Sequence, residues 1–326
     1  MIPSPMTSPA ATSFRALIPL SLCLALVASC GELDDDRVRL YHTEPLAPGL
    51  SQDEVEAFDH LGPVIHDKGV NFGVFSANAT RIDILFFEDP EATLPTKQFP
   101  MQRFGDVWNL YVEGIGRGQH YGYVAWGPNW PEHDDWFPGS IHGFVADVDQ
   151  DGHRFNPNKL LIDPYAKAVH RDHDWGDASL ASGPARTLST YSAAAKGIVW
   201  SSEYTWSQEE ELFRQNRQNA DWEGHRFSDL VMYEVHPKGF TASPASGVSH
   251  PGTYRGFAEK ADYLQELGIN AVELMPIHEK PLDGGYWGYN NLSFFAPEVS
   301  FAATPRPIEV LDEFKSMVDE LHKRDI

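Results

Sequence analysis

The sequence predicts a fold in two parts: an all-β sandwich in the first half of the chain, followed by the first β/α units of a (β/α)8 barrel. Short strand-like runs separated by turn residues fill residues 69–126, which is typical of a sandwich. From residue 230 onward, apolar strands alternate with helices, which is typical of parallel strands covered by helices. A complete barrel needs about 250 residues, and residues 230–326 supply about 100. We therefore expect a truncated barrel and a fragment of a longer protein.

The first 30 residues are predicted to be an export signal. Arg15 precedes an apolar run over residues 16–26 that is too short to span a bilayer as a stable helix. The run ends at Val27-Ala28-Ser29-Cys30, which resembles a bacterial lipobox. This resemblance implies a lipoprotein signal peptide, a lipid on Cys30, and a periplasmic or cell-surface protein anchored to the membrane only through that lipid. The alternative is an ordinary signal peptide in which the cysteine is coincidental.

Residues 31–60 are charged and polar, and we predict a flexible leader there. Cys23 would be removed with the signal and Cys30 would be acylated, so no disulfide is expected.

Residues 61–165 are predicted to form the sandwich. Its strands are expected at 70–76, 81–87, 107–112 and 120–126, where β-branched and aromatic residues partly alternate with others. Residues 166–225 are rich in Ala, Ser, Asp and Trp and lack a clear period, so we interpret them as a connector with some local helix.

Residues 226–326 are predicted to start the barrel. The apolar run 230–236 is expected to be a buried parallel strand. One helix is expected over 256–267, with Gly268 as its C-terminal cap, and a second strand over 269–276. A long loop (277–307) leads to a last helix, whose apolar positions from Leu311 to Leu321 lie on one face.

The bulk composition limits the possible partners. The formal net charge is −22, from 47 acidic and 25 basic residues, which argues against nucleic acid as a ligand. A neutral polymer such as a glucan would not be repelled by this charge. The hydrophobic fraction of 42% is sufficient for a globular core.

A series of motifs, in order along the chain, resembles isoamylase-type debranching enzymes of the α-amylase superfamily (glycoside hydrolase family 13). Residues 69–87 resemble the start of the family 48 carbohydrate-binding module that precedes those barrels. Two segments are similar to secreted bacterial isoamylases: 121–131 (YGYVAWGPNWP) and 147–159 (DVDQDGHRFNPNK). The first barrel strand and the segments after it are similar at 233–241 (YEVHPKGFT), 252–256 (GTYRG), 271–276 (AVELMP), 286–290 (YWGYN) and 295–297 (FAP).

This resemblance implies an enzyme that hydrolyses α-1,6 branch linkages of glycogen, amylopectin or branched dextrins with retention of configuration. Retaining hydrolysis needs two carboxyl groups about 5 Å apart. In the family the catalytic carboxylates follow barrel strands four, five and seven, which would lie after Ile326. We therefore predict no catalytic residue in this chain, which alone is expected to be inactive.

Two other functions remain open from the sequence. One is an α-1,4-glucan branching enzyme, because the Trp-Gly-Tyr loop occurs in both types; the segments 121–131 and 163–166 favour debranching. The other is a non-catalytic glucan-binding lipoprotein built from the sandwich and a partial barrel.

The resemblance also predicts substrate contacts. Tyr289 matches a family tyrosine that stacks on the sugar next to the scissile bond, and Tyr286 and Trp287 lie beside it. The alternative is that these rings only pack the loop under the barrel rim. Substrate contact is favoured for Tyr289, whereas packing is favoured for Trp287. For Trp126, Trp130 and Trp136, packing between domains is favoured over a glucan-stacking platform on the sandwich.

Calcium is the one cofactor that the resemblance suggests. Asp147, Asp149 and Asp151 look like the start of an EF-hand loop, but Asn158 stands where that loop needs a bidentate Glu. Isoamylases bind calcium between this segment and the loop after strand two, which implies Asp147, Asp149, Glu279 and Glu298 as ligands. Lys280 and Leu282 replace expected oxygen ligands, so the alternative is an Asp-rich turn with Lys280 as a counter-charge.

Overall fold

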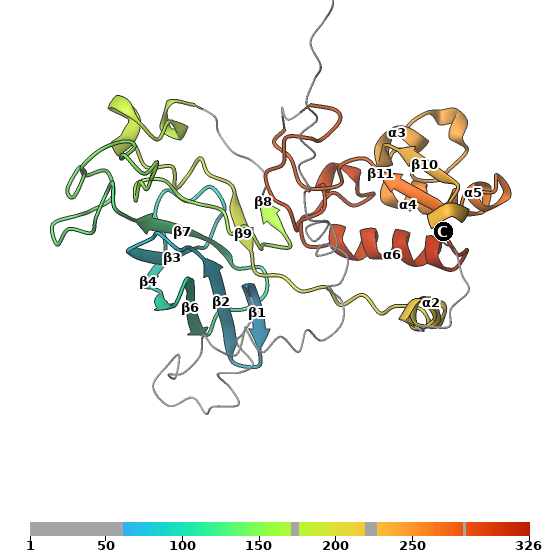
Figure 1. Cartoon of the computed structure of the whole chain (residues 1–326), viewed down its shortest axis with the longest axis horizontal. Coiled ribbons are helices and arrows are strands. Elements are labelled where there is room, and N and C mark those ends of the chain that lie inside the picture. Colours follow the sequence, from blue (N-terminus) through green and yellow to red (C-terminus); the bar gives the residue numbers. More distant parts are fainter. Residues whose placement is uncertain (1–60, 171–175, 219–226, 283–284) are drawn as a thin grey trace, which may run out of the picture. The chain divides into compact units, whose positions relative to one another are not determined.

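The computed structural model describes residues 61–170, 176–218, 227–282 and 285–326 (Figure 1). The predicted signal peptide, its Cys30 and the leader at 31–60 lie outside the described residues.

Two antiparallel sheets form the sandwich, as the sequence predicts. The first has the order β1(Gly62–His66)-β2(Gly69–Phe75)-β6(Val107–Glu113)-β5(Gln102–Phe104). The second has the order β4(Lys97–Pro100)-β3(Arg81–Phe87)-β7(His120–Trp126)-β9(Lys196–Ile198)-β8(Val169–His170). Figure 1 shows β1, β2 and β6 side by side, and β3 beside β7.

Strand β3 is buried on both of its faces, which explains why its sequence alternates only in part. Ile82, Ile84 and Phe86 belong to the core that also includes Phe72 of β2. Leu85 and Phe87 point to the opposite face, because successive side chains alternate along a strand. There they join a second core that covers the outer side of the five-stranded sheet.

The sandwich extends beyond the predicted boundary at residue 165. Strands β8 and β9 lie within the predicted connector, and β9 pairs with β7. Such strands of two and three residues are too short to show a period in the sequence. The buried Lys159 ammonium also attaches residues 176–188 to the sandwich. It donates hydrogen bonds to the carbonyl oxygens of Ala178 (2.6 Å), Ala185 (3.0 Å) and Leu188 (2.7 Å).

The start of the barrel contains the predicted parallel pair of strands. β10(Met232–Val235) pairs in parallel with β11(Ala271–Leu274). The helices of this half are α3(Pro237–Thr241), α4(Tyr254–Ala258), α5(Ala261–Glu266) and α6(Val310–His322). Short 3-10 helices are η2(Asp177–Ser179), η3(Gly183–Thr187), η4(Phe227–Asp229), η5(Pro244–Ser246) and η6(Val299–Phe301).

The single helix predicted over 256–267 is wrong, because the structure has two short helices there. At the break, the Lys260 amide bonds to Phe257 O at 2.9 Å, three residues back, instead of four. The predicted cap is confirmed: Gly268 has φ 84°, a left-handed conformation that suits glycine.

The prediction that the first barrel strand is buried is also wrong for this chain. Met232 is 50% exposed and Tyr233 is 39% exposed. Among the described residues β10 has β11 as its one strand neighbour, and the helices cover one side of this pair. The apolar sequence of this strand is typical of a parallel strand in a complete sheet, where both faces are covered, and this chain covers only one of them.

Part of the predicted connector packs on the last helix. α2(Gln208–Gln218) follows an extended segment at 199–207. The Tyr204 hydroxyl and the Ser207 amide both donate to the carboxylate of Asp319 on α6, at 2.6 and 3.2 Å. Phe213 stacks on His322 with ring centroids 4.1 Å apart. No pattern in the sequence predicted these contacts.

Candidate functional site

The long loop after β11 is held as a paired segment at its two ends. The Glu279 amide bonds to Ala296 O at 2.8 Å, and the Glu298 amide bonds to Ile277 O at 2.7 Å. The Glu279 carboxylate accepts a hydrogen bond from Val299 N at 2.8 Å. The residues between these ends therefore project from a fixed base, at the carboxyl end of a barrel strand, where (β/α)8 enzymes build their sites.

Three aromatic side chains are presented by this loop. Tyr286, Trp287 and Tyr289 are 52%, 56% and 71% exposed. Gly288 has φ 78° and lets the chain turn between Trp287 and Tyr289. An exposed aromatic ring can stack on the apolar face of a sugar, and a tyrosine hydroxyl can form hydrogen bonds with the hydroxyl groups of the sugar. The exposure argues against the alternative in which Trp287 only packs the loop.

His236 lies directly behind this loop. It is 7% exposed and caps α3, where its Nδ1 accepts a hydrogen bond from Gly239 N at 3.0 Å. Its ring stacks on Tyr286 with centroids 4.3 Å apart and an interplanar angle of 15°. The sequence motifs assigned no role in the site to His236. A histidine at a strand end before Pro-x-Gly was the available signal for a cap.

The two sandwich carboxylates predicted as metal ligands are engaged with other groups. Asp147 forms an ion pair with Arg186 (2.7 Å) and accepts a hydrogen bond from Gly183 N (3.2 Å). These contacts hold the pKa of Asp147 below its ordinary value, mainly through the hydrogen bond from Arg186. Asp149 accepts hydrogen bonds from the amides of Asp151 and His153, at 3.0 and 2.9 Å.

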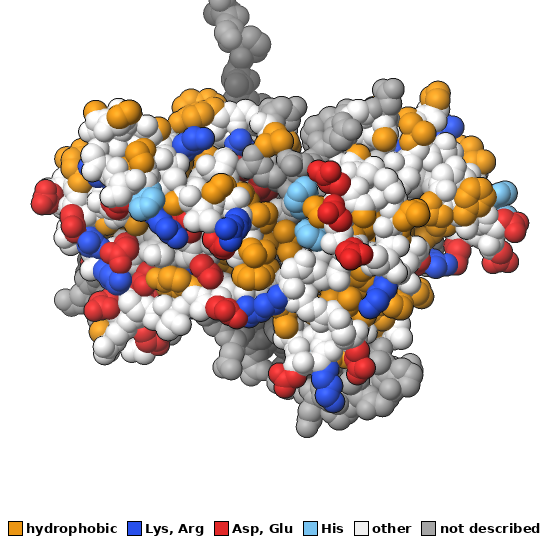
Figure 2. All heavy atoms as spheres, turned by 180° about the vertical axis from the view of Figure 1, so that it is seen from behind, with side chains coloured by type: hydrophobic (Ala, Val, Ile, Leu, Met, Phe, Trp, Pro, Cys, Tyr) orange, Lys and Arg blue, Asp and Glu red, His pale blue; other side chains and the backbone are white. Residues whose placement is uncertain are grey.

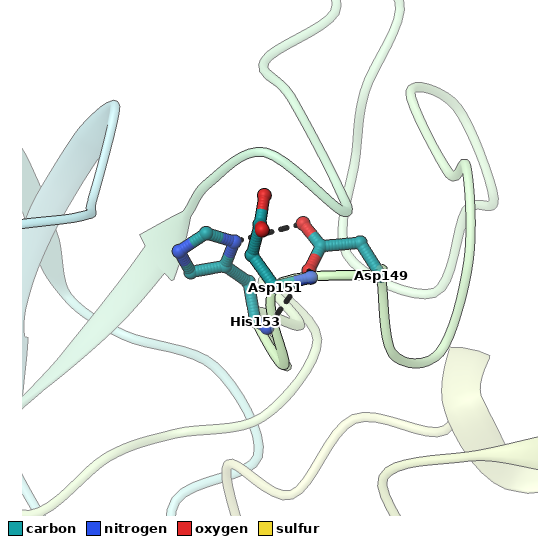
Figure 3. A group of neighbouring side chains, drawn as sticks. All are labelled: Asp149, Asp151 and His153. Carbon is teal, nitrogen blue, oxygen red and sulfur yellow. Dashed lines mark hydrogen bonds and ion pairs between the residues drawn. The ribbon is translucent and has the colours of Figure 1, made fainter.

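The structure does not gather the four predicted calcium ligands into one group. Within the described ranges, the acidic and histidine side chains close enough to share a metal are Asp149, Asp151 and His153, with ligand atoms within 4.8 Å of one another (Figure 3). His153 Nδ1 lies 2.8 Å from Asp149 Oδ2. A set that includes an imidazole is unlike the all-oxygen shell of calcium, so these residues do not fit that ion.

Glu279 and Glu298 lie on paired segments of the loop and bind its backbone. Glu298 accepts hydrogen bonds from Lys280 N at 3.1 Å and Ser300 N at 3.0 Å. The sequence therefore found the acidic residues that organise the loop, while their role as calcium ligands stays a prediction.

Trp126, Trp130 and Trp136 pack in one core cluster of the sandwich, with Trp136 partly buried at its edge. Trp126 and Trp130 are each 1% exposed, and the Trp136 ring meets Trp126 edge-on with centroids 4.9 Å apart. The Trp130 indole N–H donates to His142 O at 2.8 Å. The favoured reading, packing, agrees with this geometry, although the contacts lie within the sandwich and not between domains.

Two parts of the chain match known protein families. Residues 60–166 match carbohydrate-binding module 48, the isoamylase N-terminal domain. Residues 234–326 match the α-amylase catalytic domain. The chain therefore contains a carbohydrate-binding module 48 domain followed by the first part of an α-amylase catalytic domain. The resemblance found in its motifs is thereby confirmed, and so is the order of its two domains.

The curated relatives of the chain include isoamylases and a glycogen debranching enzyme. The chain is 33% identical over 282 residues to an isoamylase of Flavobacterium sp. The aligned region covers 78% of this chain and 35% of the relative. It is 35% identical over 280 residues to a glycogen debranching enzyme of Yersinia enterocolitica. This aligned region covers 82% of this chain and 37% of the relative. The chain thus spans about a third of the length of these curated relatives.

Solved structures agree on the fold. A pullulanase from Bacillus acidopullulyticus superposes with a TM-score of 0.53 at 22% identity, covering 82% of this chain and 28% of the pullulanase. A multi-modular glycogen-degrading pneumococcal virulence factor superposes with a TM-score of 0.55 at 19% identity, covering 82% and 26%. A sandwich followed by the start of an α-amylase-type barrel is therefore the fold of the described part of the chain.

Within the described residues, every helix is too short or too polar to cross a bilayer.

Proposed function

We propose that this chain supplies the carbohydrate-binding module and the substrate-contacting loop of an isoamylase-type debranching enzyme, which hydrolyses α-1,6 linkages of glycogen or amylopectin. The main support for this proposal is the loop after β11, which exposes Tyr286, Trp287 and Tyr289. The names of the curated isoamylase and debranching relatives support it. The chain itself is proposed to bind the glucan, and no residue of it is assigned to bond cleavage.

The glucan contact is tested by replacing one ring. Tyr289→Ala should lower the apparent affinity for amylopectin, measured by retardation in a native gel that contains it, by about fivefold, because stacking of one ring contributes of the order of 1 kcal/mol. Tyr263→Ala is the matched control, since Tyr263 is a half-exposed tyrosine on α5, outside the loop. Equal retardation of the wild type and the Tyr289→Ala chain would exclude Tyr289 from the glucan contact.

The reaction is tested on the native protein isolated from its source. Release of linear chains from amylopectin is the expected result. New branch points in place of linear chains would replace the proposal with the branching-enzyme alternative. Glucan binding without either reaction would leave the non-catalytic glucan-binding protein.

We further propose export by the lipobox-like signal, with a lipid on Cys30 anchoring the protein to a membrane. The apolar run after Arg15 and the small residues before Cys30 support this proposal. The intact mass of the native protein, extracted with detergent, should equal that of a chain beginning at Cys30 with a diacylglyceryl group attached. Cys30→Ser should abolish the lipid and release the protein from membranes. A mature protein cut elsewhere and carrying no lipid would reject the anchor.

Calcium binding is a separate proposal that the resemblance alone supports. Of the four implied ligands, Glu279 and Glu298 lie on paired segments of the loop. Calcium titration by calorimetry at low ionic strength tests it. Heat of binding that is lost in Glu279→Gln would support the site, whereas no heat and no shift in melting temperature would reject it.

A further inference from the structure

We infer that His236 is a positioning residue that fixes the conformation of the Tyr286–Tyr289 loop from behind. Its effect on glucan affinity rests on the function proposed above, but its effect on the loop does not. The two can therefore be tested separately.

The hydrogen bonds of His236 determine where its proton lies. The backbone N–H of Gly239 can only donate, so the Nδ1 that it meets at 3.0 Å must accept. The neutral ring then carries its proton on Nε2, which lies 2.9 Å from Tyr286 O, a group that can only accept. The cap of α3 thus orients a donor toward the backbone of the aromatic loop.

The side chains of the loop contact the same ring. Tyr286 stacks on one face of His236 at 4.3 Å, while Trp287 lies edge-on with centroids 6.0 Å apart. Phe301 of η6 meets His236 from another side at 5.3 Å. Three aromatic rings from two segments therefore enclose one imidazole that is 7% exposed.

Gly239 shows how closely α3 and the loop are fitted. A Cβ built on this glycine would lie 2.7 Å from the Tyr286 hydroxyl, too close for any real contact. The first turn of α3 therefore presents both a hydrogen-bonded histidine and a bare backbone to the same tyrosine.

This arrangement can preorganise a binding surface. Trp287 and Tyr289 are largely exposed, so their own packing contributes little to their order. Backbone fixed beforehand at Tyr286 reduces the conformational entropy that a ligand must remove on binding. His236 would thereby influence affinity without touching the sugar.

The discriminating variant is His236→Asn. Asparagine is a good N-cap, so it keeps the hydrogen bond from Gly239 N but removes the stacked ring and the Nε2 donor. Hydrogen exchange at residues 285–290 should become about tenfold faster in the variant, because one hydrogen bond and one ring contact are lost, while the Gly239 amide stays protected. Unchanged exchange across the loop would overturn the inference.

Two further measurements need no loss of the cap. A ¹⁵N–¹H spectrum of the wild-type imidazole should show a protonated Nε2 and an unprotonated Nδ1; the opposite tautomer would contradict the inference. Gly239→Ala, which pushes against the Tyr286 hydroxyl, should also speed exchange in the loop, and Tyr286→Phe in the same background should restore it. If His236→Asn loosens the loop but Tyr289→Ala leaves amylopectin binding unchanged, the positioning role stands and the proposed glucan contact fails.

Discussion

At the scale of single residues, Asp163 places a carboxyl group inside the sandwich, out of contact with water. It is fully buried and accepts hydrogen bonds from the hydroxyls of Tyr121 (2.7 Å) and Tyr123 (3.3 Å) and from Tyr165 N (2.8 Å). Burial raises the pKa of Asp163 to about 6, although the three hydrogen bonds act in the opposite direction. The sandwich core therefore contains a carboxyl group that folding favours in its protonated form.

This environment predicts a pH dependence of stability. Because the folded pKa is about 6 and the ordinary value is 3.8, the folded state holds the proton to higher pH, and this contribution to stability is lost as pH rises from about 4 to 6. Asp163→Asn removes the titration with little change of shape. The free energy of unfolding of the wild type relative to the variant should fall by up to about 3 kcal/mol over this range, measured by urea unfolding at each pH. A difference that stays constant with pH would contradict the raised pKa.

The sequence predicted the site residues unevenly, for a physical reason. Tyr286, Trp287 and Tyr289 lie in one short motif, so a single local pattern finds them. The predicted ligand Asp147 is neutralised by Arg186 of η3, which lies 39 residues along the chain, so its environment depends on a contact between distant parts of the sequence. His236 depends in the same way on Tyr286, 50 residues away. Local patterns identify residue types, but such pairings arise only in the folded chain.

At the scale of elements, the 199–218 segment behaves as a strap on α6. The Asp319 carboxylate, 2% exposed, is its main attachment. Burial raises the pKa of Asp319, but hydrogen bonds from Ser207 and Tyr204 outweigh that effect and leave the pKa below its usual value. The strap is thus fastened by a buried, ionised carboxylate, a group that is costly to leave without partners.

Removing this attachment should release the strap. Asp319→Ala leaves the Tyr204 hydroxyl and the Ser207 amide without their acceptor, and we expect a loss of about 2–4 kcal/mol in the free energy of unfolding. Limited proteolysis should also cut within 199–218 sooner. Glu320→Ala is the control on the same helix, because Glu320 is part-exposed and pairs with Lys323 and Arg324. Surface ion pairs of this kind contribute less than about 1 kcal/mol, so equal losses in both variants would refute the strap.

Elements were predictable in proportion to their length. The strands at 69–75, 81–87, 107–113 and 120–126 each have seven residues, enough for a side-chain pattern to appear. β8 and β9 pair with the same sheet but have two and three residues, and the sequence assigned them to a connector. The break between α4 and α5 could not be predicted from the sequence, because Phe257, Ala261 and Leu264 keep helical spacing across it and are all buried.

At the scale of the whole molecule, the charge separates the classes of possible ligand. The net charge is −22, and Figure 2 shows acidic and basic side chains interspersed on the face drawn. A polyanion would be repelled by this molecule, and its binding would depend on releasing counterions. A neutral glucan has no condensed counterions, and the rings proposed to hold it interact by stacking.

Glucan affinity should therefore be almost independent of salt. Between about 50 and 500 mM NaCl we expect less than a twofold change in the dissociation constant for amylopectin, because screening acts on charges that a neutral polymer lacks. Binding to an amylopectin-coated surface at each salt concentration measures this. Tyr289→Ala should be weaker at every concentration by the same factor, since its loss is a loss of stacking. A dissociation constant that rises steeply with salt would point instead to ion pairs between the chain and a charged ligand, and would shift the search from the aromatic loop to the basic side chains.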